Sequence, residues 1–410
     1  MKNNYMRRNF IWNLLGTSFN AFTSLFFLII VTRINGVDKA GIFSFGFSTA
    51  CLFFYIAIYS GRVFQVTEKK DISNKEFVVS RIINSFLMII VTFVFLFIKH
   101  YSFYKVIVIL LLCFYKLLEA FSDVFYGILQ KEDYLYKAGI SLVIKSVVAT
   151  ILLLGVDYFT GNIILSLLCM IIFNILVFIF YDLRNSVVYI KFRDKVNWDN
   201  IKYILRIGFF PFIISFLNLY LVNSSKYAID NYLADNYQTI FNIIIMPATV
   251  LSLFSQFILY PYLNKISEYI KKNNYIKLNK LVSNICLAVV IFGIIAIILG
   301  YLLGIPVLSF IYNVDLGSYR LLLVIILVGA VFMALASIMT NLLVSIRVLK
   351  TQTILFTILA LLSLIFSNMT VKNYGINGAC YFYTLIMMML FIVMFITYKI
   401  CMRNKKMSIS

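Results

Sequence analysis

Twelve apolar stretches, each long enough to cross a lipid bilayer, constrain this chain more than any other feature of its sequence. They fall at 10–32, 40–60, 79–98, 104–126, 138–158 and 163–181, and then at 204–228, 239–263, 282–303, 319–344, 351–370 and 376–399. A helix of about 20 apolar residues spans the hydrocarbon core of a membrane. Because 62% of the residues are apolar and only 13% are charged, we predict an all-α integral membrane protein with twelve transmembrane helices.

The basic residues between these stretches predict the orientation of the chain. If the amino terminus lies in the cytoplasm, the cytoplasmic segments hold 25 Lys and Arg residues and the outer links hold 6. Short cytoplasmic loops are enriched in Lys and Arg. We therefore predict a multi-pass protein of the cell (inner or plasma) membrane with both termini in the cytoplasm. The net charge of +20 then reflects orientation and contact with membrane lipids, and no nucleic-acid partner is expected.

A basic link near the middle of the chain divides the predicted helices into two sets of six. We predict an N-terminal lobe at 1–181, a basic cytoplasmic linker at 182–203, and a C-terminal lobe at 204–410 that ends in a cytoplasmic tail. Residues 34–43 and 231–241 are weakly similar, at an offset of 197. Since six is even, both lobes would enter the membrane from the same face. A pseudo-twofold axis would then run along the membrane normal, with a cleft between the lobes.

Four of the ionisable residues inside predicted spans of the first lobe are candidates for a functional site: Lys116, Glu119, Asp123 and Lys145. The first three are spaced three and four residues apart and therefore share one helix face. An ionised side chain within a membrane costs at least ~2.5 kcal/mol, so it should face protein or water. One interpretation is a polar patch that opens onto the cleft. The alternative is a neutralised pair, Glu119 with Lys116 or Lys145, that only joins two helices.

Further polar residues are candidates for the cleft, although ordinary hydrogen bonds between helices would explain several of them equally well. Polar stripes mark the first and seventh spans, and arginines at predicted helix ends could bind phosphate through their planar fork. Prolines inside the seventh and eighth spans could form hinges or static kinks. The candidates are Asn20 and Asn218 for the stripes, Lys226 and Asp230 for an outer pair, Arg33, Arg62 and Arg81 for phosphate, and Pro211 and Pro247 for hinges.

The sequence shows no catalytic constellation. The six cysteines have no CxxC spacing, a single histidine is present, and no glycine-rich nucleotide loop occurs. We therefore predict a protein that is not an enzyme and that binds no cofactor and no metal.

Three local motifs give the chain a resemblance to a known family. The first is Arg62-x-x-Gln65-Val66-Thr67-Glu68 followed by Arg81. The second is Asp123-Val124-Phe125-Tyr126-Gly127-x-x-Gln130-Lys131, followed by Ala138-Gly139-x-Ser141. The third is Lys226-Tyr227-Ala228-Ile229-Asp230-x-Tyr232, followed by Met246-Pro247-Ala248. Together with the two six-helix halves, they resemble polysaccharide flippases of the multidrug/oligosaccharidyl-lipid/polysaccharide exporter superfamily, in which Asp is usual at the position of Glu68.

The resemblance implies a flippase that works by alternating access. Its cargo would be an undecaprenyl-diphosphate oligosaccharide, the repeat unit of an O-antigen, capsule or exopolysaccharide, moved from the cytoplasmic to the outer face. Lys116, Lys145 and Lys226 would offset the diphosphate charge, and Glu119, Asp123 or Asp230 could carry a coupling proton or sodium ion. A polymerase and glycosyltransferases of the same pathway would be partners. The alternatives are a drug or small-molecule/ion antiporter of the same superfamily and, less favoured, a membrane-embedded polysaccharide polymerase or acyltransferase.

Overall fold

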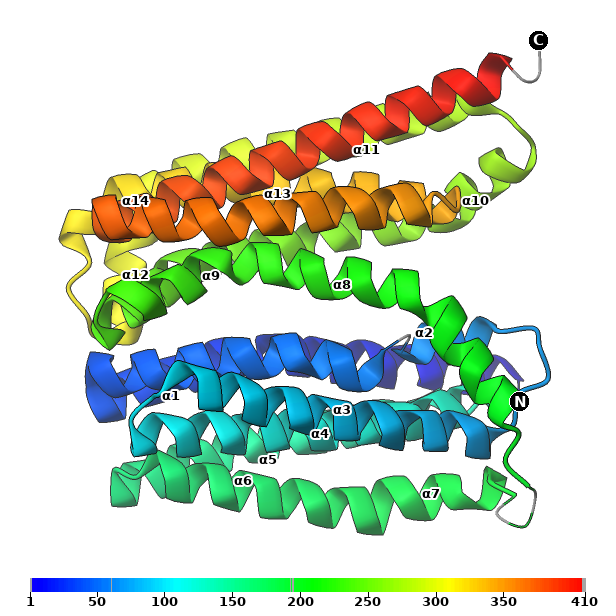
Figure 1. Cartoon of the computed structure of the whole chain (residues 1–410), viewed down its shortest axis with the longest axis horizontal. Coiled ribbons are helices and arrows are strands. Elements are labelled where there is room, and N and C mark those ends of the chain that lie inside the picture. Colours follow the sequence, from blue (N-terminus) through cyan, green and yellow to red (C-terminus); the bar gives the residue numbers. More distant parts are fainter. Residues whose placement is uncertain (1, 60, 192, 194, 408–410) are drawn as a thin grey trace. The chain divides into compact units, whose positions relative to one another are not determined.

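Every element of regular secondary structure in the described part of the chain is a helix (Figure 1). The computed structural model describes the backbone of residues 2–59, 61–191, 193 and 195–407. Within these residues, nine helical segments are long and apolar enough to cross a membrane. A further helix, α4 (Phe103–Lys131), is 29 residues long, but every stretch of 18 residues within it holds at least three charged residues, whereas each of the nine has a stretch with at most two. The chain is therefore an all-helical, multi-pass membrane protein.

Two of the nine segments each contain two of the predicted spans. Helix α1 (Lys2–Ile58) bends at Gly36 and α14 (Leu349–Met407) bends at Gly375, where φ is 78° and 58°. Glycine adopts positive φ without steric cost, so each element consists of two helices that meet at a non-helical glycine. The sequence predicted short polar links at these places, and the structure reduces each link to a single non-helical residue between two helices. Arg33, predicted at a helix end, lies three residues before Gly36, in the last turn of the first helix of α1.

The chain divides into two compact units, unit 1 (Met1–Phe216) and unit 2 (Leu217–Ser410), and the division falls inside helix α8 (Trp198–Tyr232). In unit 1, helix α1 packs against α3, α4 and α5, and α4 also packs against α2 and α6. The remaining elements of unit 1 are α2 (Gly61–Thr67), α3 (Asn74–Lys99), α5 (Leu135–Thr160), α6 (Ile163–Val177), the π-helix η1 (Phe178–Leu183), α7 (Arg184–Ser186) and η2 (Val187–Tyr189).

Unit 2 is built around α13 (Arg320–Ser345), which packs against α9, α11 and α14. The predicted span 282–303 continues beyond its expected end, because a π-helix joins α11 to α12 and keeps the chain helical to Tyr312. The other elements of unit 2 are α9 (Asp235–Leu259), η3 (Tyr260–Tyr262), α10 (Leu263–Lys271), α11 (Tyr275–Leu299), η4 (Gly300–Gly304), α12 (Ile305–Tyr312) and η5 (Gly317–Tyr319).

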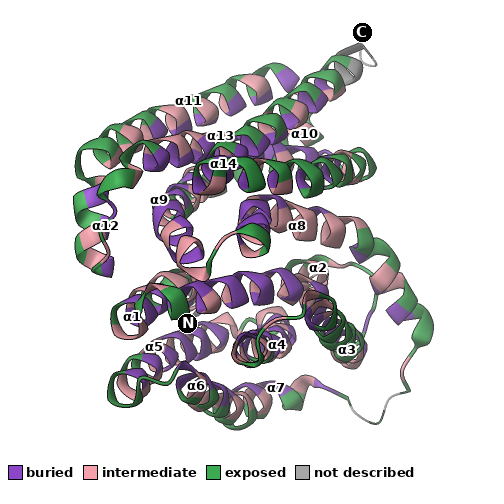
Figure 2. Cartoon of the chain, turned by 60° about the vertical axis from the view of Figure 1, so that its left-hand side comes forward, coloured by how far each residue is buried: buried purple, intermediate pink, exposed green. Residues whose placement is uncertain are grey.

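Large apolar side chains cover the outer surface of helices such as α3. Phe86, Phe93 and Phe97 of α3 are 63%, 58% and 80% exposed. Buried polar residues, including Arg81 and Asn84, lie on another face of the same helix. Figure 2 shows exposed and buried residues sharing the same helices. This pattern, apolar outside and polar inside, is what a lipid solvent requires.

A close approach of two helices positions α5 in unit 1. A Cβ atom added to Gly139 of α5 would lie 2.3 Å from the backbone of Trp12 in α1, and one added to Gly16 of α1 would lie 2.6 Å from the carbonyl oxygen of Gly139. Small residues permit such close packing between membrane helices. Gly139 belongs to the second of the three motifs, so at least part of that motif serves helix packing.

We expect Gly139→Ala to lower thermal stability, because backbone atoms of α1 would have to move to admit the new methyl group. Overpacking of this kind costs about 1–3 kcal/mol. The matched control is Gly155→Ala in the same helix, since a Cβ at Gly155 meets no atom within 4 Å. Gly155→Ala should leave the melting temperature unchanged or raise it slightly. Melting curves of the purified variants would test this, and equal stability of the two variants would contradict it.

Candidate functional site

Helix α4 carries three of the four intramembrane candidates named above, Lys116, Glu119 and Asp123, and one face of the helix holds all of them. At about 100° per residue they lie within about 60° of one another around the helix axis. Ser122 and Tyr126 extend this polar face to about one third of the circumference. Each of these residues contacts a neighbouring helix or an adjacent residue in one of three clusters. Helix α4 is therefore the common wall of the polar interior of unit 1.

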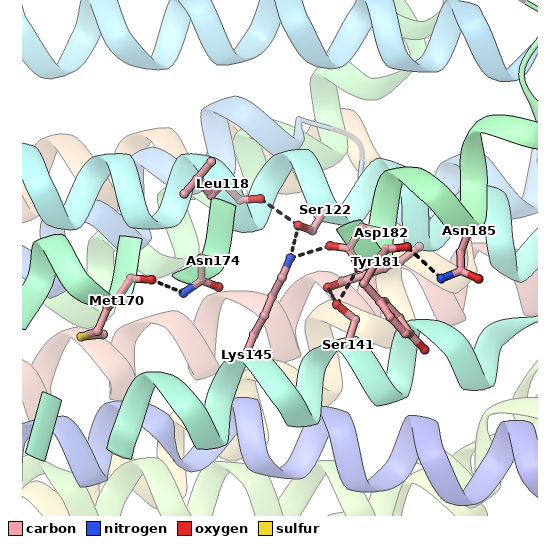
Figure 3. A network of polar contacts seen from close by, with 10 residues as sticks. Leu118, Ser122, Ser141, Lys145, Met170, Asn174, Tyr181, Asp182 and Asn185 are labelled. Carbon is pink, nitrogen blue, oxygen red and sulfur yellow. Dashed lines mark hydrogen bonds and ion pairs between the residues drawn. The ribbon is translucent and has the colours of Figure 1, made fainter. Parts of the chain in front are cut away.

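The most deeply buried cluster joins Lys145 of α5 to Asp182 of the π-helix (Figure 3). Lys145 Nζ lies 2.5 Å from Asp182 Oδ2 and donates to Ser122 Oγ of α4 at 2.5 Å. Ser141 of α5 donates to Asp182 Oδ1 at 2.6 Å, and the Tyr126 hydroxyl lies 2.8 Å from Ser141 Oγ. The side chains of Lys145 and Asp182 are only 9% and 1% exposed. The cluster ties three helical segments together with every charge paired.

A second cluster surrounds Lys116 of α4. Its Nζ atom lies 2.6 Å from Glu119 Oε2, and Asn20 Nδ2 of α1 donates to Glu119 Oε1 at 3.2 Å. Aromatic rings also lie within reach of the ammonium group, at 5.0 Å for Phe47 and 5.7 Å for Phe54. Both the carboxylate and the ring faces stabilise a cation there. The structure thus pairs Glu119 with Lys116, which was one of the two pairings predicted.

A third cluster joins α3 to α4 through Arg81 and Asp123. Arg81 donates from one terminal nitrogen to Asp123 Oδ2 at 3.1 Å and from the other to the Ala57 carbonyl oxygen at 3.3 Å. The prediction that Arg81 lies at a helix end was wrong. Helix α3 begins at Asn74, where Ser73 and Glu76 form a capping box. Arg81 is therefore about two turns inside the helix.

Two of the sequence motifs meet beside this third cluster. Gln65 of α2 is buried and donates to the Val124 carbonyl oxygen at 3.1 Å. A Cβ at Gly127 would lie 2.2 Å from Gln65 Oε1, so only glycine leaves room for this contact. A cavity of about 10 Å³ lies between Gln65 and Arg81, which is about the size needed for one water molecule.

Each of the three clusters contains one basic and one acidic side chain, so their charges balance. In two of these ion pairs the acidic side chain is more exposed than the basic one. The Lys116 and Arg81 side chains are 11% and 5% exposed, whereas their partners Glu119 and Asp123 are 21% and 23% exposed. The carboxylates are thus the more accessible members of these pairs. An anionic ligand would have to displace a carboxylate to reach either cation directly.

The structure places the remaining predicted residues on α1, α2, α8 and α9, where their roles stay predictions. Arg33 is exposed, and Arg62, Asn218, Lys226 and Asp230 are half-buried. Pro211 lies inside α8 and Pro247 inside α9, as predicted. Near Lys226, the Ser225 hydroxyl donates to the Ala379 carbonyl oxygen of α14 at 2.8 Å. This part of the polar stripe of the seventh span therefore forms an ordinary hydrogen bond between helices, which was the alternative to its lining a cleft.

Asp182 was missed because the predicted sixth span stopped at residue 181. A signal in the sequence could have identified Asp182. Without it, the three clusters would hold three basic residues and only two acidic ones. With Lys116 paired to Glu119 and Arg81 to Asp123, Lys145 needs its own acid, and Asp182 directly follows the predicted span 163–181. A π-helix at this place also indicates a local adjustment of the helix, often found at functional positions.

Comparison with known proteins gives one similar curated sequence and several similar structures. No family model matches the chain. The capsular polysaccharide biosynthesis protein CapF of Staphylococcus aureus is 24% identical over 378 residues, which is 91% of this chain and 94% of CapF.

Among solved structures, the lipid II flippase MurJ in an inward closed conformation has a TM-score of 0.71 at 19% identity, over 95% of this chain and 87% of MurJ. An inward-facing multidrug resistance MATE family transporter of the multidrug/oligosaccharidyl-lipid/polysaccharide exporter (MOP) superfamily has a TM-score of 0.69 at 14% identity, over 97% of this chain and 100% of that one. The chain therefore has the fold of transporters of the MOP superfamily.

Proposed function

We propose that this MOP-fold chain is a flippase that moves an undecaprenyl-diphosphate-linked oligosaccharide repeat unit from the cytoplasmic to the outer face of the membrane. The observation that carries the proposal is the similarity to CapF, which extends over 91% of the chain and concerns a protein of capsular polysaccharide biosynthesis. The fold of a lipid II flippase is a second support, since lipid II flippase activity also concerns a lipid-linked cargo.

The proposal includes the finer architecture expected from the sequence. The bent helices α1 and α14 each supply two spans, and α4 supplies one despite its charges. Twelve spans then form two lobes of six, at 1–181 and 204–410, around a pseudo-twofold axis along the membrane normal. Both termini face the cytoplasm, and the protein moves its cargo by alternating access. Pro211 and Pro247 serve as hinges in this movement.

The ion pairs of unit 1 suggest how an anionic headgroup would be handled. In this mechanism the diphosphate replaces Glu119 as the partner of Lys116 and Asp123 as the partner of Arg81. Exchange of one anion for another keeps each buried cation neutralised throughout, which avoids the large cost of an unpaired charge. The displaced carboxylates, being the more accessible members of the pairs, can take up a proton or a cation.

The decisive experiment is deletion of the gene in a host with no second flippase. We expect lipid-linked repeat units to accumulate on the cytoplasmic face, where a membrane-impermeant label for sugars cannot reach them in intact spheroplasts. Restoration of the gene should restore labelling. Full labelling in the deletion strain would reject the proposal.

The second candidate is a multidrug exporter, which the similarity to a multidrug resistance transporter favours. Deletion would then raise sensitivity to cationic compounds and leave surface polysaccharide unchanged. Because the three ion pairs of unit 1 are each neutral, their charges favour neither a cationic drug nor an anionic headgroup, and the deletion phenotype decides between the two candidates.

A further inference from the structure

A buried acidic residue outside the three clusters, Asp157 of α5, has an incomplete set of hydrogen-bond partners. Its side chain is wholly inaccessible, and Asn35 Nδ2 of α1 donates to Asp157 Oδ2. The other oxygen of the carboxyl group, Oδ1, is buried without a hydrogen-bond partner among the described residues, and so is Oδ1 of Asn35. Two side chains in contact therefore present two buried acceptor oxygens that lack a donor.

Among the described residues, none of the ion pairs involves Asp157. The charged and titratable groups near it are Lys39 of α1, which is exposed, and Tyr104 of α4. Helix α6, which also packs against α5, carries no acidic or basic residue between Ile163 and Val177. An ionised carboxylate would thus be desolvated without a paired charge, and burial of this kind favours the protonated acid.

We propose that Asp157 is a proton-binding site. The protonated carboxyl group donates from its Oδ1 atom to Oδ1 of Asn35, while Asn35 Nδ2 donates to Oδ2. One proton thereby provides the missing donor for both orphan oxygens. A hard metal cation such as Mg²⁺ or Ca²⁺ fits less well, because it takes about six to eight oxygen ligands and only two are left unpartnered here.

This inference deepens the proposed function by naming a different proton carrier. Glu119 and Asp123 each pair with a base, so they have less need of a proton than Asp157. The use of the Asp157 proton to couple transport rests on the proposed function. Binding of the proton itself does not, and it can be measured on the purified protein without substrate.

Infrared difference spectroscopy during a pH titration of the full chain in lipid nanodiscs tests the proposal. We expect a C=O stretching band of a protonated carboxylic acid at neutral pH that disappears in Asp157→Asn. Glu268→Gln is the matched control, because Glu268 is exposed and paired with Lys272 at 2.7 Å, and it should keep the band. Absence of the band in the wild type, or its persistence in Asp157→Asn, would overturn the proposal.

A second variant keeps the test valid if Asp157→Asn fails to fold. Asn35→Ala removes the acceptor of the proposed hydrogen bond and should shift the band to higher frequency. An unchanged frequency would overturn the proposal. The outcome is independent of the gene-deletion experiment, so failure of the flippase assignment and failure of the proton site are distinguishable.

Discussion

Replacement of Asp182 by Asn is expected to destabilise the folded protein by about 3–5 kcal/mol, because the change leaves Lys145 as a buried charge without its counter-charge. Lys145 Nζ would keep the Ser122 hydroxyl as an acceptor, but a hydroxyl does not neutralise an ammonium ion. The replacement Lys145→Met should have a comparable effect, since it leaves Asp182, whose side chain is 1% exposed, without a base.

The double variant Lys145→Met/Asp182→Asn should recover most of the stability lost in either single variant, since it removes both buried charges together. The matched control is the exposed pair of Glu268 and Lys272, whose side chains are 53% and 69% exposed. Loss of that exposed pair should leave the stability nearly unchanged, because water and salt screen its charges. Unfolding in a detergent titration would measure all variants. A stable Asp182→Asn single variant would show that Asp182 is not the counter-charge of Lys145.

The apolar stretches predicted the helical membrane fold well, because lipid contact requires long uninterrupted apolar surfaces. The links were harder to predict. Gly36 is followed by the polar residues Asp38 and Lys39, which indicated a loop, yet helical structure resumes after Gly36 and includes both residues. Local composition cannot distinguish a polar loop of several residues from a one-residue turn between two helices.

The candidate site was predicted in part. The spacing of Lys116 and Glu119 was sufficient to place them on one face and to make their pairing one of the two that were predicted. The partners supplied by other helices were not predictable from spacing. Asp182 reaches Lys145 only because a π-helix carries α6 beyond residue 181, and Ser141 and Tyr126 are residue types that occur in most membrane helices without special meaning.

The orphan oxygens of Asn35 and Asp157 illustrate the same limit. In the sequence, Asn35 belongs to a predicted link and Asp157 to the outer end of a predicted span, separated by 122 positions. Their contact depends on the packing of α1 against α5, which Gly16 and Gly139 permit. Sequence periodicity gives the face of one helix and does not give the register between two helices.

Replacement of Lys116 by Ala is expected to abolish transport, with a loss of about 100-fold or more, while the protein still inserts in the membrane. A factor of 100 corresponds to about 2.7 kcal/mol, which is within the range for a desolvated, hydrogen-bonded charge that contacts an anion. Lys116→Arg keeps the charge and should retain part of the activity. Labelling of flipped repeat units in spheroplasts would measure transport, and the amount of membrane-inserted protein would be measured in parallel.

The neutral variant Lys116→Met/Glu119→Gln separates a substrate-binding role from a structural one. It removes both charges of the pair and retains an amide that Asn20, which donates to Glu119 Oε1 in the wild type, can still contact. Its stability should therefore stay within about 1 kcal/mol of the wild type, because a buried pair is often replaced by neutral residues without loss. If the pair only joins α1 to α4, this stable variant will transport normally. If Lys116 exchanges Glu119 for the diphosphate of the cargo, the same stable variant will be inactive, because nothing in it replaces the ammonium group that receives the anion.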